Sequence, residues 1–233
     1  MGICLSHTSQ AVSHTQRNFR RRIWVCMGEM KTRNKSLLAV LATLCVSALA
    51  SCGSSTASEL RGYRSPTPKN SADVFVTDAA TGQPMELRAD DGELLIVYFG
   101  YTHCPDICPT TLVAVKNAKN RLGDNAAKID LAMITVDPDR DTPDVLPRYL
   151  SSFTDKFHAL VPSSETELRT AEQAFDATSS VTVVDGKVEV VHGGTCYVID
   201  SSGDVIDEFP FGMDAESMAH DLTILLKERE TQQ

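Results

Sequence analysis

The sequence contains the stretch Tyr98-Phe-Gly-Tyr-Thr-His-Cys-Pro-Asp-Ile-Cys-Pro-Thr-Thr-Leu112, which places two cysteines between an apolar run and an amphipathic segment. Residues 94–99 are continuously apolar and mostly β-branched or aromatic, which is typical of a strand buried on both faces. Cys104 and Cys108 each precede a proline, and a residue in that position disfavours the α conformation. We therefore expect both cysteines in a turn, followed by a helix that begins at Pro109.

The start of that helix predicts reactive thiols. Unpaired N–H groups at a helix N-terminus favour negative charge, so a cysteine there should have a pKa below the ordinary value of about 8.5. Thiolates are the nucleophiles of disulfide exchange and also soft metal ligands. The placement of Cys104 and Cys108 therefore favours redox chemistry or metal binding.

Short apolar runs alternate with amphipathic stretches along the rest of the chain. Asp185-Gly186 between two valine-rich runs indicates a hairpin, and Ser164 with Glu167 forms a capping box. The expected strands are residues 74–76, 85–87, 94–99, 129–136, 181–184, 188–191, 196–199 and 205–209. The expected helices are residues 109–122, 143–150, 165–175 and 215–229, and the last three are capped by Thr142, Ser164 and Asp214. This order predicts a thioredoxin-like α/β fold, with a central mixed sheet flanked by helices and with extra N-terminal and internal hairpins.

The first 51 residues have the pattern of a targeting segment. Three basic residues between positions 31 and 35 precede an apolar run over residues 37–50, and small residues lead from it to Cys52. This pattern predicts a bacterial lipoprotein signal peptide over residues 30–51, with Cys52 as the lipid-bearing first residue of the mature protein. The expected location is the outer face of the cytoplasmic membrane. The alternative is a plain N-terminal anchor helix with a buried Cys52.

The remaining boundaries follow from composition. Met30 begins a complete signal by itself, so residues 1–29 are expected to be an extension from a mis-assigned start. Residues 52–70 are rich in Ser, Thr, Pro and Gly, which predicts a flexible tether. Residues 71–230 then form one domain with a substantial core.

The charge balance bears on partners. The chain has a net charge of −9, and removal of residues 1–51 would take away seven basic residues and one acidic residue to leave −15. Nucleic acid is therefore not an expected partner.

Three segments together resemble the Sco/SenC family of copper chaperones. They are the cysteine stretch quoted above, Ile134-Thr-Val-Asp-Pro-Asp-Arg-Asp-Thr-Pro143, and a lone His192 ahead of Tyr197-Val-Ile-Asp200. The resemblance implies a copper-binding domain over residues 71–230 whose metal ligands are Cys104, Cys108 and His192. It also implies copper as Cu(I) or Cu(II), assembly of the binuclear copper site of cytochrome c oxidase, and the copper-site subunit of that oxidase as partner.

Metal chemistry supports the same three ligands. Soft thiolates select Cu(I) or Zn(II), and imidazole accepts copper in either oxidation state. A structural zinc site usually has four protein ligands, and no fourth Cys or His pairs evidently with these three. Gly193-Gly194 after His192 predicts a flexible bend that moves the imidazole toward the thiols or away from them.

Four further residues have open roles. Asp137, Asp139 and Asp141 are expected to orient the ligands, with Asp137 and Asp139 as the second shell, although turn formation around Pro138 also explains them. Cys196 lies in an apolar run and is expected to be a buried core residue, with an accessory thiol as the alternative.

Other functions remain open. The main alternative is a thiol-disulfide oxidoreductase that keeps the copper-site cysteines of the oxidase reduced, with Cys104 and Cys108 as its redox-active disulfide. Three intervening residues, in place of the two in Cys-x-x-Cys reductases, argue against a general thioredoxin. A structural disulfide, a peroxidase and a copper-sensing or scaffolding lipoprotein are further alternatives. For the chaperone itself no catalytic residue is expected.

Overall fold

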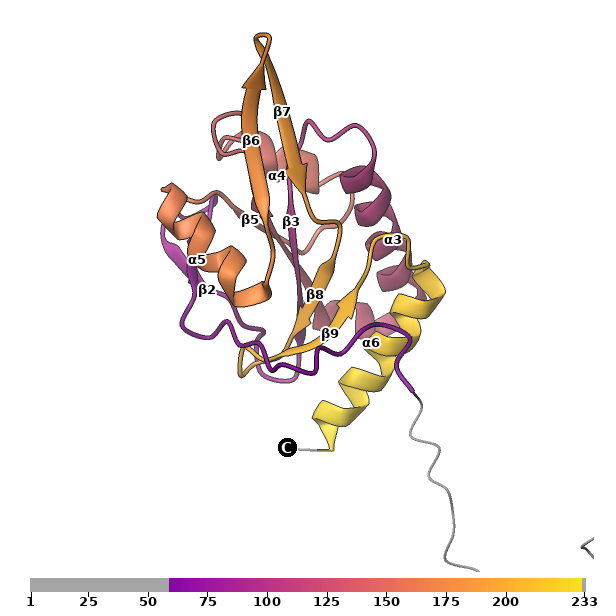
Figure 1. Cartoon of the computed structure of the whole chain (residues 1–233). Coiled ribbons are helices and arrows are strands. Elements are labelled where there is room, and N and C mark those ends of the chain that lie inside the picture. Colours follow the sequence, from indigo (N-terminus) through magenta and orange to yellow (C-terminus); the bar gives the residue numbers. More distant parts are fainter. Residues whose placement is uncertain (1–58, 232–233) are drawn as a thin grey trace, which may run out of the picture. The chain divides into compact units, whose positions relative to one another are not determined.

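The computed structural model describes residues 59–231. The expectations for residues 1–29, the signal peptide, Cys52 and the first part of the tether lie outside the described residues. In chain order the elements are β1 (Phe75–Thr77), β2 (Pro84–Glu86), β3 (Leu94–Gly100), α3 (Ile107–Arg121), the 3₁₀ helix η2 (Gly123–Lys128), β4 (Ile129–Thr135), α4 (Val145–Leu150), β5 (His158–Leu160), α5 (Glu165–Phe175), β6 (Ser179–Val184), β7 (Lys187–His192), β8 (Cys196–Ile199), β9 (Val205–Phe209) and α6 (Ala215–Glu230) (Figure 1).

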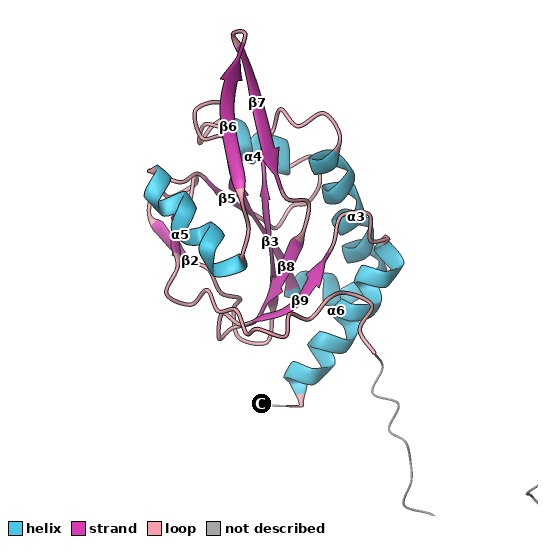
Figure 2. Cartoon of the chain, in the orientation of Figure 1, coloured by secondary structure: helices cyan, strands magenta, loops and turns pink. Residues whose placement is uncertain are grey.

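A mixed five-stranded sheet forms the centre of the domain, with strand order β5-β4-β3-β8-β9. Strands β3, β4 and β5 are parallel, whereas β8 is antiparallel to β3 and β9 is antiparallel to β8. Helices α3 and α6 lie side by side next to the sheet, and α5 lies on the other side (Figure 2). The expected thioredoxin-like fold is confirmed.

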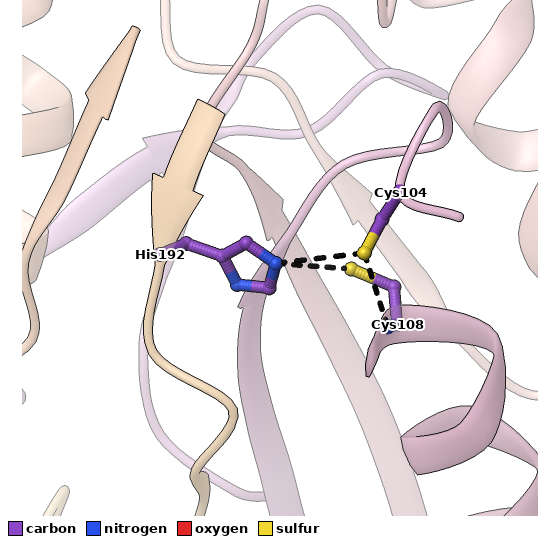
Figure 3. Close-up of side chains that lie close together, drawn as sticks. All are labelled: Cys104, Cys108 and His192. Atoms are coloured by element: carbon purple, nitrogen blue, oxygen red, sulfur yellow. Dashed lines mark hydrogen bonds between the residues drawn. The ribbon is translucent and has the colours of Figure 1, made fainter. Parts of the chain in front are cut away.

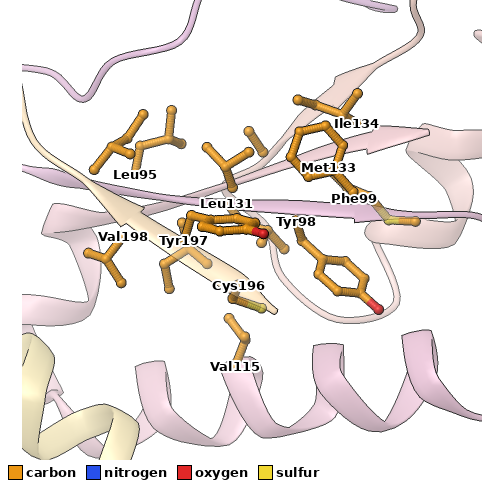
Figure 4. Close-up of a cluster of buried hydrophobic side chains, with 14 of the residues drawn as sticks. Leu95, Tyr98, Phe99, Val115, Leu131, Met133, Ile134, Cys196, Tyr197 and Val198 are labelled. Carbon is orange, nitrogen blue, oxygen red and sulfur yellow. The ribbon is translucent and has the colours of Figure 1, made fainter. Parts of the chain in front are cut away.

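Side chains on β3 alternate between the two faces of the sheet, and every residue of this strand is buried. Tyr98 and Cys196 lie on the face that α3 covers (Figure 4). Phe99 packs on the opposite face, where its ring meets Phe175 of α5 at a centroid distance of 5.6 Å. Helices thus cover both faces of the central strand, which explains why its sequence is apolar throughout.

Both expected hairpins are present as separate two-stranded sheets, β1–β2 and β6–β7. The β6–β7 hairpin projects from the domain (Figure 1), and most of its side chains are exposed. Its turn residues Asp185 and Gly186 have φ angles of 50° and 76°. Positive φ at both central positions is the requirement of a type I′ turn, which the Asp-Gly pair satisfies.

The expected start of helix α3 was wrong by two residues. The helix begins at Ile107, so Cys108 lies within its first turn and not before it. Pro109 occupies the third helical position, where a missing N–H leaves no intrahelical bond unmade. That tolerance outweighs the restriction that a proline places on the residue before it.

Two other elements differ from expectation. Helix α4 begins at Val145, two residues later than the expected first helical residue Pro143. Strand β5 is only three residues long and was not expected at all. It is held by parallel pairing with β4, which is a non-local contact that a short apolar run does not reveal.

The tether expected up to residue 70 was wrong for its second half. The N–H groups of Arg61 and Gly62 donate to the carboxylate of Asp221 on α6, with distances of 2.7–3.0 Å. The N–H of Tyr63 donates to the Glu208 carbonyl at 2.9 Å. Residues 59–70 therefore belong to the domain, because groups distant in sequence satisfy their backbone polar atoms. Within residues 59–231, no helix has the length and apolarity needed to cross a membrane.

Candidate metal centre

The structure brings together the two thiols and the imidazole that the sequence indicated. Cys104 lies in the loop after β3, Cys108 in the first turn of α3, and His192 at the end of β7 (Figure 3). His192 Nε2 is 3.8 Å from Cys104 Sγ and 3.5 Å from Cys108 Sγ. Among the described residues, this is the single group of three His, Cys, Asp or Glu side chains close enough to hold a metal ion.

The tautomer of His192 follows from its hydrogen bonds. Nδ1 lies 3.1 Å from the carbonyl oxygen of Phe99 and 2.7 Å from that of Gly193. Both oxygens can only accept hydrogen bonds, so the proton of the neutral ring resides on Nδ1. The lone pair of Nε2 therefore points at the two sulfurs, which is the arrangement that a metal-binding imidazole requires.

The two thiols differ in their environments. Burial raises the pKa of Cys104, but hydrogen bonds, first among them the one from the Cys108 N–H, outweigh burial and lower it to about 7. Cys108 is fully buried, and burial raises its pKa to about 12. The expectation of a lowered pKa at the helix start therefore does not hold for Cys108, because desolvation exceeds the effect of the helix terminus.

The spacing of the donor atoms suits a transition metal. With metal–sulfur bonds of about 2.3 Å, metal–nitrogen bonds of about 2.0 Å and angles near 120°, each sulfur would lie about 3.7 Å from the nitrogen. The observed separations of 3.8 and 3.5 Å agree with this value. Two thiolates and one imidazole are also the donors that copper favours.

A cleft of about 390 Å³ gives access to the site. One wall is the thiol loop with the start of α3, and the other is the end of β7. A larger hollow of about 560 Å³ lies elsewhere, beside the N-terminus of α5, and neither cysteine of the site lines it. Cys104 therefore borders the first cleft, which opens to solvent, and does not border the larger hollow.

Asp137 and Asp139 both line the larger hollow and not the thiol cleft. Asp137 is buried and forms an ion pair with Arg140, whose guanidinium lies 5.9 Å from the Tyr101 ring. The Tyr101 ring meets His192 edge-on at 5.4 Å, so Asp137 reaches the site through two intermediates. Asp139 is exposed.

Asp141 has the most direct contact with the thiol loop. Its fully buried carboxylate accepts hydrogen bonds from the Thr102 N–H at 2.9 Å and the Thr135 hydroxyl at 2.7 Å, and from the Thr102 hydroxyl as well. It thus ties the loop before Cys104 to the end of β4. The sequence offered Asp141 among three aspartates, and only the hydrogen bonds single it out.

Two residues of the site were missed by sequence reasoning. Gly100 is required because an added Cβ would lie 3.0 Å from Cys108 Sγ and 2.7 Å from Cε1 of Tyr98. Tyr98 was read only as part of an apolar strand, yet it is packed against the site. Cys196 is fully buried on β8, as expected of a core residue, and lies outside the three-residue group.

The fold and this site define a class of protein: a thioredoxin-like domain that carries two thiols and one imidazole at the edge of a cleft. The SCO1/SenC family model matches residues 64–227. An SCO2-like protein of Rickettsia prowazekii is 33% identical over an alignment of 158 residues that covers 62% of this chain and 77% of that protein. The chain belongs to the SCO1/SenC family.

Solved structures agree with this assignment. The copper-bound ScoI of Bradyrhizobium japonicum is 29% identical, with a TM-score of 0.55 over 67% of this chain and 96% of that chain. BsSco is described as having a disulfide switch and as a member of the Sco family of cytochrome c oxidase assembly proteins. It is 19% identical to this chain. Its TM-score is 0.55 over 71% of this chain and 98% of its own, which shows a shared fold.

Proposed function

We propose that this protein is an extracytoplasmic copper metallochaperone that binds one copper ion through Cys104, Cys108 and His192. The observation that carries the proposal is the convergence of Nε2 and both sulfurs at separations suited to a three-coordinate ion. The copper-bound relative from Bradyrhizobium japonicum supports copper as the metal. Cu(I) suits the thiolates, and the imidazole allows Cu(II) as well.

We propose that the copper is cargo for the copper-site subunit of cytochrome c oxidase. Membership of the family to which BsSco belongs supports this destination. Three protein ligands leave room for an incoming donor, so a partner's ligands can replace the chain's own one at a time. Cys104 borders the cleft and is the natural first thiol to meet them.

Metal analysis tests the binding step. Protein loaded with copper under reducing conditions should hold about one copper per chain, and Cys104→Ala, Cys108→Ala or His192→Ala should each weaken binding strongly. Cys196→Ala is the matched control, since it removes a buried thiol outside the group. Unchanged stoichiometry and affinity in both Cys104→Ala and Cys108→Ala would end the proposal.

A transfer assay tests the destination. Copper-loaded protein is mixed with the metal-free soluble copper domain of the oxidase subunit, and the absorption spectrum of the assembled binuclear site is followed. Transfer should exceed that from the same concentration of free copper in the presence of a competing chelator. Equal rates from both sources would argue against a chaperone role.

Thiol-disulfide exchange is the second candidate, and the unequal exposure of the two thiols favours it. Cys104 borders the cleft, whereas Cys108 is fully buried. The Cys104 thiolate would attack a partner disulfide and release one partner thiolate. The Cys108 thiolate would then attack the mixed disulfide, form the Cys104–Cys108 bond and release the second partner thiolate. Disulfide reduction that is insensitive to His192→Ala, together with weak copper binding, would favour this function.

We also propose that a lipid on Cys52 holds the protein at the outer face of the bacterial cytoplasmic membrane. The support is the signal-like pattern of residues 30–51. In a bacterial host, Cys52→Ser should move the protein from the membrane fraction to the soluble one. Mass spectrometry should find a mature chain that begins at a modified Cys52, and a product that retains residues before Met30 would contradict the proposal.

A further inference from the structure

Tyr98 carries a buried hydroxyl that lacks a partner. The side chain is fully buried on β3, and within residues 59–231 its hydroxyl oxygen makes no hydrogen bond of normal geometry. The hydroxyl of Thr111 on α3 is in the same condition. Unsatisfied buried hydroxyls are unfavourable, and a native fold seldom keeps one without a compensating use.

The Tyr98 ring lies against two of the three proposed metal ligands. Gly100 leaves a gap in which Cε1 of Tyr98 and Sγ of Cys108 both approach the same point, at 2.7 and 3.0 Å from where a Cβ would stand. The ring also meets the His192 ring edge-on, with centroids 6.2 Å apart. Figure 4 shows Tyr98 on the α3 side of the sheet, which is the side from which Cys108 approaches.

The two sulfurs differ in the donors that face them. Cys104 Sγ accepts a hydrogen bond from the Cys108 N–H at 3.4 Å. The fully buried Cys108 sulfur has the Tyr98 side chain beside it instead, across the gap at Gly100. A neutral thiol is a weak acceptor, whereas a metal-bound thiolate is a strong one.

We propose that Tyr98 is a positioning residue for Cys108: its hydroxyl donates a hydrogen bond to the Cys108 sulfur when that sulfur is a metal-bound thiolate. The inference rests on the proposed binding of copper by Cys104, Cys108 and His192. While Cys108 is a free thiol, the Tyr98 hydroxyl has no acceptor among the described residues. It is then available to donate a hydrogen bond in the copper-loaded state.

This role makes two properties respond in opposite directions to Tyr98→Phe. Metal-free Tyr98→Phe should be as stable as wild type or more stable, because the change removes an unsatisfied polar atom and keeps the ring. Affinity for Cu(I) should fall about tenfold or more, because the loaded thiolate loses a charge-assisted hydrogen bond. A purely structural tyrosine would lose stability and affinity together.

The experiment compares wild type, Tyr98→Phe and Tyr197→Phe. Tyr197 is a matched control because it is also buried, but packs against Phe175 on the other side of the sheet. Cu(I) affinity is measured by competition with a chromophoric chelator, the sulfur-to-Cu(II) charge-transfer band by absorption, and metal-free stability by denaturant unfolding. The expected result is weaker affinity and a shifted band in Tyr98→Phe alone, with its stability kept.

Three outcomes would overturn the inference. If the Cu(I) affinity of Tyr98→Phe lay within twofold of that of Tyr197→Phe and the charge-transfer band had the same position in both, the hydroxyl would have no role in the loaded site. A parallel loss of stability and affinity would show a structural role. Failure of wild type to bind about one copper would reject the proposed function and this inference with it, so failure of the inference alone is recognised by normal binding in wild type.

Discussion

Nδ1 of His192 lies 3.1 Å from the carbonyl oxygen of Phe99, although 93 residues separate the two along the chain. Phe99 belongs to the central strand, and His192 is the last residue of the projecting hairpin. This hydrogen bond therefore fixes the hairpin against the sheet at the point where the thiols emerge. The orientation of the imidazole depends on that contact and on the 2.7 Å contact of Nδ1 with the Gly193 carbonyl oxygen.

The thiols should differ sharply in reactivity. In metal-free reduced protein, iodoacetamide should modify Cys104 first, with a rate that rises around pH 7 because its pKa is lowered to about 7. Cys108 and Cys196 are fully buried and should react only when the fold opens. Peptide mapping by mass spectrometry after timed quenching measures this order, and equal labelling of Cys104 and Cys108 at neutral pH would contradict it.

A methyl group at position 100 should disturb the site. Gly100→Ala would place Cβ 2.7–3.0 Å from Tyr98, Cys108 and Met133, so overpacking should lower the free energy of unfolding by about 1–3 kcal/mol. Copper affinity should fall as well, since Cys108 must shift. Gly193→Ala is the control, because within the described part of the chain no atom beyond its two sequence neighbours lies within 4 Å of the added Cβ. Denaturant unfolding of both variants checks this, and equal stabilities would refute it.

Removal of the Asp141 carboxylate should loosen the thiol loop. Asp141→Ala leaves the Thr102 N–H and the Thr135 hydroxyl without their acceptor, which should destabilise the fold by about 2–3 kcal/mol. Alkylation of Cys104 should become faster. The control is Asp139→Ala, which removes an exposed carboxylate and should change stability by less than about 0.5 kcal/mol. If Asp139→Ala proved the more damaging change, the assigned role of Asp141 would be incorrect.

The buried Asp207 should make stability depend on pH. Burial and the neighbouring Asp221 carboxylate raise the pKa of Asp207 from 3.8 to about 7. Because the pKa of Asp207 is raised in the folded state, protonated Asp207 makes its full contribution to the free energy of unfolding below pH 3.8. This contribution is lost as the pH rises to about 7. The loss has an upper limit of about 1.4 kcal/mol per pH unit.

Asp207→Asn tests this dependence. The asparagine amide cannot ionise, so the variant should lack this part of the slope between pH 4 and 7 and should be more stable than wild type at pH 8. Unfolding at pH 4.5, 6 and 8 provides the comparison, and the difference between the proteins removes other titrating groups such as His158. Parallel pH profiles would show that Asp207 is ionised throughout this range.

Part of the metal centre could be predicted from the sequence because its signals are local. A buried strand followed by two cysteines and a helix predicts where the thiols emerge, and the length of the apolar run over residues 94–99 predicts the extent of that strand. The third ligand was found through resemblance, since a lone histidine has no local pattern. The start of α3 was misplaced because the proline rule describes one residue pair, whereas a helix start depends on all the N–H groups of its first turn.

The amino-acid sequence by itself determined the α/β class, the strand, thiol loop and helix, the Asp-Gly hairpin and the candidates Cys104 and Cys108, because periodicity and turn chemistry act over a few residues. Resemblance to the family added His192. Only the tertiary structure decided that Asp141 and not Asp139 braces the thiol loop, that residues 59–70 dock on α6 and β9, and that Tyr98 lies beside Cys108. These contacts join segments far apart along the chain, and which groups meet there follows from packing of the whole core.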